Sequence, residues 1–258
     1  MESLVVDDRG IPKARYKRIG AFSRLSRRPL VNKAKLVVII FFPLSPRLAY
    51  LVGAVYGDGS VSFRRLTYFN TDENWLVGVA RELTRLTVSG RPRPQFFSPE
   101  QRGCYSIDYC NAALARLIRG SAKTRLGTIS KLTDSRARLA AFLGGVFDSE
   151  GSASLYVNES HRNGTPEIAI ANSNLGMLRI LQRRLQRFGV VGGISLSRKP
   201  MEGLIDDRRI KWKKKVYRLR FSGWSSARRF AKIVAPWTKS REKRERLERI
   251  LQNGAVGI

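Results

Sequence analysis

The sequence predicts an α+β fold made of two similar halves. The main evidence is an internal repeat, because residues 51–63 (LVGAVYGDGSVSF) are echoed by residues 143–155 (LGGVFDSEGSASL). In both copies, small and apolar residues at helical spacing give way after a glycine to the alternation typical of a strand. A repeat of this kind marks duplicated structural units, so we expect a helix followed by a strand in each half.

A second echo lies downstream of the first. Residues 70–76 (NTDENWL) align with residues 172–178 (NSNLGML), at an offset ten residues larger than that of the first echo. The additional residues fall at 158–166, where Asn-Gly and Pro indicate a lengthened hairpin turn. Each half therefore reads as helix, strand, strand, helix, strand, strand, helix.

Local signals define the elements of the first half. Its first helix begins after Ser45, a suitable N-cap, has Pro46 at the first helical position and ends at Gly59. After that glycine the apolar Val61 and Phe63 point to one side of a strand. Further strands are expected at residues 91–98 and 103–110, and a helix at 111–118.

The second half repeats these signals. Thr133, Asp134 or Ser135 caps the corresponding helix, which ends at Gly151. The remaining strands are expected at residues 194–199 and 211–222, followed by a helix at 225–234 and a final charged helix at 241–252.

Composition divides the chain into four parts. Residues 1–45 have no counterpart in the second half and form a basic N-terminal arm. Residues 46–119 make the first half, and residues 135–258 make the second half with its C-terminal helix. Residues 120–134 are polar, basic and weakly periodic, so we expect a linker there.

The charge of the chain points to a polyanionic partner. Its 49 Lys and Arg against 20 Asp and Glu give a net charge of +29 and a pI near 11.2. Such a surplus is typical of nucleic-acid binding. A membrane partner is not expected, because the apolar run at 36–42 is too short to span a bilayer and the charge is not confined to one amphipathic helix.

The scarcity of Cys and His excludes several chemistries. Cys104, Cys110 and His161 are the only such residues, so neither a disulfide framework nor a Cys/His zinc site is available from within the chain. A Ser-His-Asp catalytic triad would have to use His161, the one histidine of the sequence. The same scarcity suggests a reducing compartment, cytoplasmic or associated with the nucleoid.

Each repeated helix ends in a carboxylate, Asp58 in the first half and Glu150 in the second. Small residues lie four apart on one face of each helix, at Gly53 and Gly57 and at positions 145 and 149. If the helices cross along these faces, both acids emerge together at helix ends where the dipole disfavours negative charge. The pair therefore needs a cation. Hard oxygen ligands without thiol or imidazole favour Mg²⁺, helped by the backbone carbonyls of Gly57 and Ser149.

The two segments 51–59 and 143–151 resemble the paired motifs of a monomeric LAGLIDADG homing endonuclease, in particular archaeal intron-encoded members, over roughly residues 46–235. The resemblance implies two αββαββα halves related by a pseudo-twofold axis, whose two four-stranded antiparallel sheets form a saddle on DNA. It also implies two or three divalent ions, bound by Asp58 and Glu150, and cleavage of both strands across the minor groove to leave 3′ overhangs. The implied partner is double-stranded DNA with a long pseudo-palindromic or asymmetric target, bound by a monomer.

The resemblance assigns further residues to the active site. Asn70 and Asn172 match the position of a polar residue that holds the attacking water or a metal ligand. Many members also have a lysine near each site, yet the strand around Ser106 contains none, whereas Arg218 lies in the matching strand of the second half. We therefore predict that the two strands of the target are cut at unequal rates.

The predicted sheets supply a DNA-binding face. In the last strand Tyr217, Leu219 and Phe221 would pack on the helices, leaving basic residues to face outward. We expect phosphate or base contacts from the outward polar and basic residues of both halves, namely Ser60, Ser62, Arg64, Arg65, Thr67, Arg91, Arg93, Ser152, Ser154, Tyr156, Asn158, Arg162, Ser195, Ser197, Lys199, Lys211, Lys213, Lys214, Arg218 and Arg220.

Other interpretations stay open. Asn70 and Asn172 also suit helix N-termini, where they satisfy backbone donors, and the basic cluster at 211–215 also suits a solvated strand edge. Trp75, Trp224 and Trp237 are expected in the core. An RNA maturase or a non-cleaving DNA-binding regulator would share the fold and charge, but neither needs both carboxylates.

Overall fold

The computed structural model describes residues 3–5, 41–86, 93–119, 122–158, 161–205, 208–212 and 214–253. Its two halves have the predicted α+β architecture, and each contains one four-stranded antiparallel sheet. The strand order is β3-β4-β6-β5 in the first half and β7-β8-β12-β9 in the second. In both sheets the strands that come first, second, third and fourth in the sequence lie side by side in the order first, second, fourth, third, which confirms the duplication.

The first half begins with helix α1 (Pro46–Asp58), followed by strands β3 (Gly59–Val61) and β4 (Arg65–Asn70) and by helix α2 (Glu73–Leu86). It continues with strand β5 (Gln95–Phe97), the short helix α3 (Pro99–Arg102), strand β6 (Tyr105–Cys110) and helix α4 (Ala112–Arg119). The predicted cap is confirmed, since the Ser45 hydroxyl accepts a hydrogen bond from the Leu48 amide at 3.2 Å. The strand expected at 91–98 is shorter where it is described, and residues 91 and 92 lie outside the described part.

The second half contains helix α6 (Arg136–Glu150), strands β7 (Gly151–Asn158) and β8 (His161–Asn172), helix α7 (Leu175–Gln186) and strand β9 (Gly193–Arg198). Strand β12 (Val216–Ser222), helix α8 (Trp224–Val234), the 3₁₀ turn η1 (Ala235–Trp237) and helix α9 (Arg241–Asn253) complete it. Of the three candidate caps for α6, Ser135 is the one that accepts from the helix, at the Arg138 amide.

Three details differ from the sequence expectations. The additional residues at 158–166 lengthen strands β7 and β8 rather than the turn, because Tyr156 pairs with Thr165 and Asn158 with His161. The expected linker contains helix α5 (Ala122–Leu132), whose Thr128, Ile129 and Leu132 are buried. Strands β10 (Met201–Ile205) and β11 (Arg208–Trp212) form a separate hairpin, so the strand expected at 211–222 begins only at Val216.

Part of the N-terminal arm is also described. Strand β1 (Ser3–Val5) pairs antiparallel with strand β2 (Phe41–Pro43), just before α1. No helix in the described residues is both long and apolar enough to cross a membrane.

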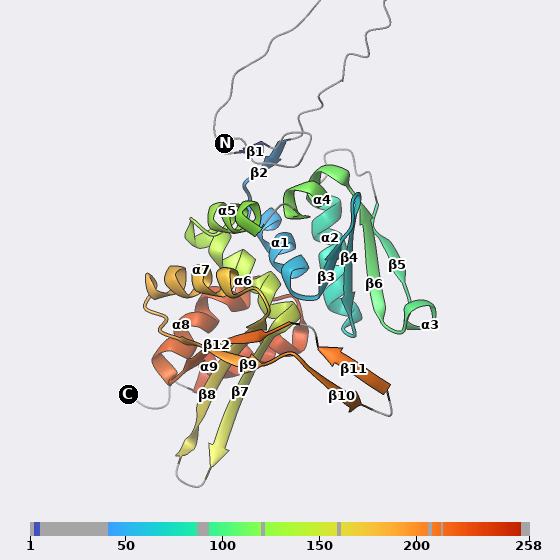
Figure 1. Cartoon of the computed structure of the whole chain (residues 1–258). Helices are drawn as coiled ribbons and strands as arrows, with labels where there is room; N and C mark the ends of the chain where they lie inside the picture. The colour runs from blue at the N-terminus through green and yellow to red at the C-terminus, as the bar shows by residue number, and fades with distance from the viewer. Residues whose placement is uncertain are drawn as a thin grey trace, which may run out of the picture.

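Helices α1 and α6 lie side by side at the centre of the molecule, and each half extends away from them (Figure 1). The core lies between these helices and the inner faces of the two sheets, with Tyr50, Trp75, Phe142 and Phe147 completely buried. Trp224 and Trp237, also expected in the core, are half-buried at its margin. This packing leaves the C-terminal ends of α1 and α6 next to each other.

Candidate active site at the ends of two packed helices

Glycines allow the close approach of α1 and α6. A Cβ atom on Gly53 would lie 2.2 Å from the Phe142 carbonyl oxygen, and one on Gly145 would lie 2.1 Å from the Tyr50 carbonyl oxygen. Both distances are far below van der Waals contact, and the atoms met are backbone atoms that cannot rotate away. The predicted crossing along the small-residue faces is therefore present, and it sets the spacing of the helix ends.

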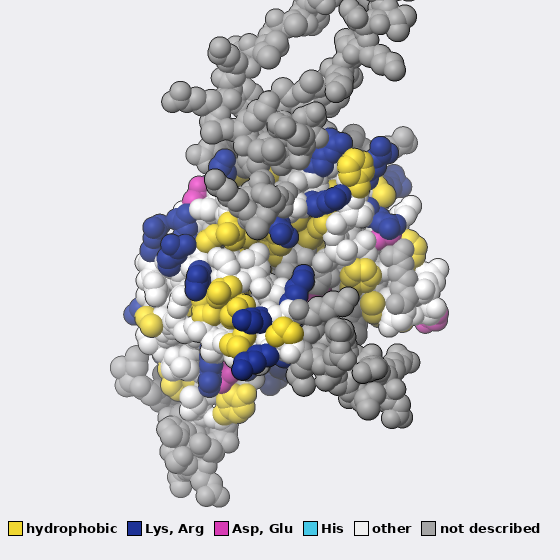
Figure 2. All heavy atoms as spheres, viewed as in Figure 1, with side chains coloured by type: hydrophobic (Ala, Val, Ile, Leu, Met, Phe, Trp, Pro, Cys, Tyr) yellow, Lys and Arg dark blue, Asp and Glu magenta, His cyan; other side chains and the backbone are white. Residues whose placement is uncertain are grey.

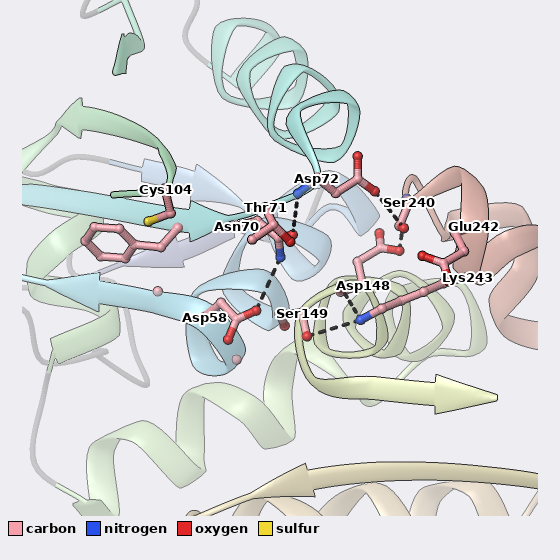
Figure 3. Close-up of a pocket in the computed structure, with 13 residues that line it drawn as sticks. Asp58, Asn70, Thr71, Asp72, Cys104, Asp148, Ser149, Ser240, Glu242 and Lys243 are labelled. Atoms are coloured by element: carbon pink, nitrogen blue, oxygen red, sulfur yellow. Dashed lines mark hydrogen bonds between the residues drawn. The ribbon is translucent and has the colours of Figure 1, made fainter. Parts of the chain in front are cut away.

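The two acids meet at these ends. Asp58 is the last residue of α1 and Glu150 the last residue of α6. A Cβ atom on Gly57, the residue before Asp58, would lie 3.0 Å from Glu150 Cγ, so Glu150 packs against the end of the opposite helix. Asp58 lines a pocket together with Asn70, Ser149 and Lys243 (Figure 3).

Burial opposes the ionisation of both carboxyl groups, and the charge of Asp58 further opposes that of Glu150. Burial, and next the charge of Asp58, raise the pKa of Glu150 to about 7. Burial also raises the pKa of Asp58, while the nearby Lys243 ammonium partly offsets this shift. An acid pair with raised pKa values at two negatively polarised helix ends has the electrostatics of a cation site.

The two predicted asparagines both reach the end of α1. Asn70 Nδ2 donates to Asp58 Oδ2 at 3.3 Å, and Asn172 Nδ2 donates to the Tyr56 carbonyl at 2.9 Å. Their Oδ1 atoms accept from the amides of Asp72 and Asn174, each at 2.8 Å. Asn70 therefore contacts an acid directly, whereas Asn172 contacts the helix backbone. The alternative helix-terminal role is realised at the same time, because each Oδ1 satisfies a backbone donor just before a helix.

Lys243, on helix α9, is the principal cation of the site. Its Nζ donates to the carbonyls of Phe147, Asp148 and Ser149 at 3.1, 2.6 and 3.1 Å, in the last turn of α6. Burial lowers the pKa of Lys243, while the carboxylates around it, including Asp58 and Glu150, oppose that shift. No local pattern in the sequence singles out Lys243, because it lies outside the repeat in a helix rich in charged residues.

A buried carboxylate fixes the position of α9. Asp148 is 1% exposed and accepts from Tyr50 Oη at 2.7 Å, from the Lys239 amide at 2.8 Å and from the Ser240 amide at 3.2 Å. Ser240 Oγ in turn donates to Asp72 Oδ2 at 2.8 Å. Burial raises the pKa of Asp148 to about 6. These bonds tie the start of α9 to both halves and direct Lys243 towards the end of α6 (Figure 3).

The donor set suits a hard divalent ion with few protein ligands. Among the described residues there is no group of three or more His, Cys, Asp or Glu side chains able to hold a metal. The available donors are two carboxylates, those of Asp58 and Glu150, and the Gly57 carbonyl. Mg²⁺ commonly binds through one or two carboxylates and retains several waters, so this set fits it. The Ser149 carbonyl, also expected as a ligand, accepts from Lys243 instead.

Arg218 does not contact the acids directly. It pairs with Ala171 and Ser195, and directly opposed residues share a face, so all three point to the outer face of the second sheet. Among the described residues Arg218 makes no hydrogen bond or ion pair with Asp58 or Glu150. In the free chain the cation that binds the end of α6 is therefore Lys243, while Arg218 stays a candidate on the outer face of the sheet.

The outer face of the second sheet is polar, as predicted. Leu219 and Phe221 are buried against the helices, and Tyr217 is half-buried, while Arg218 and Arg220 are exposed. Arg220 forms an ion pair with Glu167 on the neighbouring strand. The same face or its adjoining loops carry the other expected contacts: Ser152, Tyr156, Ser195, Ser197, Lys199 and Lys214 are exposed, and Ser154 is half-buried. Lysine and arginine side chains are also far more frequent than acidic ones on the surface in Figure 2.

In the first half, the expected residues Ser60, Ser62, Arg64, Arg65 and Arg93 are exposed. Thr67 is an exception, with 7% of its surface exposed. Its hydroxyl donates to Asp108 Oδ1 at 2.7 Å, and Arg65 binds the other oxygen of Asp108 at 3.1 Å. Thr67 therefore orients Asp108 and Arg65 and is not itself free to contact a base.

Five of the expected contacts are not described at the level of side chains. Arg91 and Lys213 lie outside the described residues. For Asn158, Arg162 and Lys211 the structure describes only the strand in which each lies.

Comparison with known proteins identifies the architecture. Residues 137–235 match the family model for a LAGLIDADG-like domain. An uncharacterized protein of Methanocaldococcus jannaschii is 25% identical over 217 residues, which cover 81% of this chain and 73% of that relative.

Two solved structures are similar over most of their length. The homing endonuclease I-DmoI in complex with DNA and Ca has a TM-score of 0.56 at 18% identity and covers 80% of this chain and 98% of that chain. The LAGLIDADG homing endonuclease I-GzeII in complex with its DNA target has a TM-score of 0.50 at 9% identity and covers 79% of this chain and 88% of that chain. Residues 137–235 are therefore similar to a LAGLIDADG-like domain, and the chain as a whole has the two-domain α+β fold of the single-chain LAGLIDADG homing endonucleases.

Proposed function

We propose that this chain is a homing endonuclease, a metal-dependent enzyme that recognises a long site on double-stranded DNA and hydrolyses both strands. The observation that carries the proposal is the pair of carboxylates, Asp58 and Glu150, at the adjoining ends of α1 and α6. The fold supports it, because the similar structures of I-DmoI and I-GzeII are complexes with DNA. The net charge of +29 supports binding to a polyanion.

The residues of the site have distinct tasks in this reaction. Asp58 and Glu150 would hold divalent ions together with the Gly57 carbonyl, and Asn70 orients the Asp58 carboxylate. Asn172 fixes the end of α1 through the Tyr56 carbonyl. When bound, the ions supply an activated water and stabilise the leaving oxygen. We propose Mg²⁺ as the ion, in two or three copies on the DNA complex, because the donors are hard oxygen atoms.

The finer features of the activity are also proposals. Two active sites facing one groove would cut across the minor groove and leave 3′ overhangs. Two different halves on one chain suit a monomer and a pseudo-palindromic or asymmetric target. We place the enzyme in the cytoplasm or at the nucleoid, where DNA is accessible and thiols stay reduced.

The test is cleavage of a plasmid library of intron insertion junctions in the presence of Mg²⁺. We expect the wild type to cut a member of the library, and Asp58→Asn and Glu150→Gln each to lose at least about a hundredfold in rate, because each removes a charged metal ligand. Asp134→Asn, an exposed acid at the opposite end of α6, is the matched control and should cut normally. Undiminished cleavage by both active-site variants would refute the site. If the wild type cuts no junction, an RNA maturase or a non-cleaving regulator is favoured instead.

A further inference from the structure

The two helix ends that carry the acids are not equivalent. In the last turn of α6 the Lys243 ammonium binds three consecutive carbonyls, including that of Ser149. At the end of α1 the Tyr56 carbonyl receives a neutral amide, that of Asn172. Within the described residues no lysine or arginine side chain binds the Gly57 carbonyl. Of the two duplicated helix ends, that of α6 is therefore already occupied by a positive charge, and that of α1 is not.

The position of Lys243 is built into the tertiary structure. The two amides that bind Asp148 and the Ser240 hydroxyl that binds Asp72 fix the first residues of α9. Lys243 follows Ser240 by three residues, so its side chain leaves the helix close to these anchors. A side chain placed by a buried network loses little further entropy when it binds the carbonyls, which favours a persistent interaction.

An ammonium group and a divalent ion compete for the same oxygen atoms. The Ser149 carbonyl precedes Glu150 just as the Gly57 carbonyl precedes Asp58, so the two carbonyls are equivalent candidate ligands in the repeat. Two cations at one carbonyl repel each other strongly at the short distances inside a partly buried site.

Building on the proposed function, we infer that Lys243 is a tethered cation that occupies the Ser149 carbonyl in place of a divalent ion. The free chain then binds divalent ions preferentially at the α1 end of the acid pair. Loading of the α6 end requires displacement of the Lys243 side chain. The lysine thus limits metal occupancy in the free chain, and it provides charge compensation for Asp58 and Glu150.

The test uses Mn²⁺ alone and the full-length chain without DNA. Binding is measured from the loss of the free Mn²⁺ electron paramagnetic resonance signal, for the wild type, Lys243→Met and the control Arg244→Met. We expect Lys243→Met to bind one additional Mn²⁺, or to bind Mn²⁺ about tenfold more tightly, because an adjacent positive charge is removed. Arg244→Met removes the same charge from an exposed neighbouring position on α9 and should titrate like the wild type.

The outcomes separate this inference from the proposed function. Equal titrations for all three proteins, or weaker binding by Lys243→Met, would overturn the competition and leave the nuclease standing. Absence of Mn²⁺ binding to every protein would also overturn the inference, whereas the nuclease is tested separately by cleavage of the junction plasmids. If Lys243→Met does not fold, as judged by circular dichroism, Lys243→Gln replaces it, because glutamine keeps a donor for the carbonyls while removing the charge.

Discussion

At the scale of single residues, the ionisation of Glu150 couples metal binding to pH. The pKa of its carboxyl group is raised to about 7, first by burial and then by the charge of Asp58. A divalent ion must displace the proton from a neutral Glu150, so metal binding releases protons and strengthens as the pH rises. The site is therefore poised to respond to pH in the neutral range.

The same shift predicts how stability depends on pH. Above pH 7 the folded chain without metal contains an ionised, half-buried Glu150, which costs free energy. As the pH falls through 7 the folded state takes up a proton that the unfolded state, with a pKa near 4.5, does not yet bind, so this cost is removed. We expect Glu150→Gln to be more stable than the wild type by about 1–2 kcal/mol at pH 8, after allowance for solvent screening, and the difference to shrink to less than about 0.5 kcal/mol at pH 5. Thermal unfolding in EDTA measures this, and a difference that is constant between these pH values would contradict it.

Asp148 shows how a residue inside the repeat motif acquired a different task from Asp58 and Glu150. It lies two positions before Glu150, yet its side chain is buried and accepts three hydrogen bonds from Tyr50, Lys239 and Ser240. A carboxylate bound by three donors is well compensated. Asp148 is thus a structural residue that holds α9, and through it Lys243, against the active site.

At the scale of elements, the contact of α1 with α6 determines whether the acids meet. The contact depends on Gly53 and Gly145, each of which leaves room for a backbone carbonyl of the opposite helix. Glycine lowers the intrinsic stability of a helix, so its presence at these positions reflects the packing and not the helix itself.

This reasoning predicts opposite effects for two glycine substitutions. Gly53→Ala should lower the free energy of unfolding by about 2–3 kcal/mol, because the added methyl group forces the helices apart. Gly127→Ala in α5, where a Cβ atom would meet nothing within 4 Å, should raise it by about 0.5–1 kcal/mol through helix propensity alone. Urea unfolding of both variants measures the difference. Equal stability of Gly53→Ala and Gly127→Ala would contradict the close approach of α1 and α6 at Gly53.

At the scale of the whole molecule, the proposed DNA contacts come from exposed arginines on the sheets. Arg218 is exposed on the outer face of the second sheet, whereas Lys232 lies on α8, which covers the opposite face. If Arg218 contacts a phosphate, Arg218→Ala should reduce the slope of log affinity against log salt by about 0.9. Fluorescence anisotropy with duplex DNA in EDTA measures the slope without cleavage. Lys232→Ala is the control, and an equal change in both variants would indicate a charge effect of the whole molecule.

The asymmetry between the halves predicts unequal cutting of the two DNA strands. Arg218 in the second half occupies the position that Ser106 occupies in the matching strand of the first half. Among the described residues, Lys243 binds the end of α6 and not that of α1. On supercoiled plasmid that carries the target, we expect nicked circles with a break mainly in one strand to accumulate before linear product. End-labelling of each strand identifies the break, and equal nicking of both strands would refute the expectation.

The sequence by itself determined the duplication, the α+β class, the ends of α1 and α6 and the pairing of Asp58 with Glu150. These features follow from local periodicity, from cap residues such as Ser45 and from a repeat whose copies must fold alike. The lengthened strands β7 and β8 and the helix α5 were missed, because Asn, Gly and Pro signals were outweighed by pairing and packing with distant segments.

Only the tertiary structure decided which cation serves the acids. Lys243 and Ser149 are 94 residues apart, and Lys239 and Asp148 are 91 apart, so no local pattern links them. Strand alignment pointed to Arg218, which lies on the outer face of β12 as predicted, but it did not reveal Lys243, which reaches the end of α6 from a separate helix. The physical reason is general: periodicity tells which side of an element is buried, whereas the partner that it meets there depends on how separate elements pack.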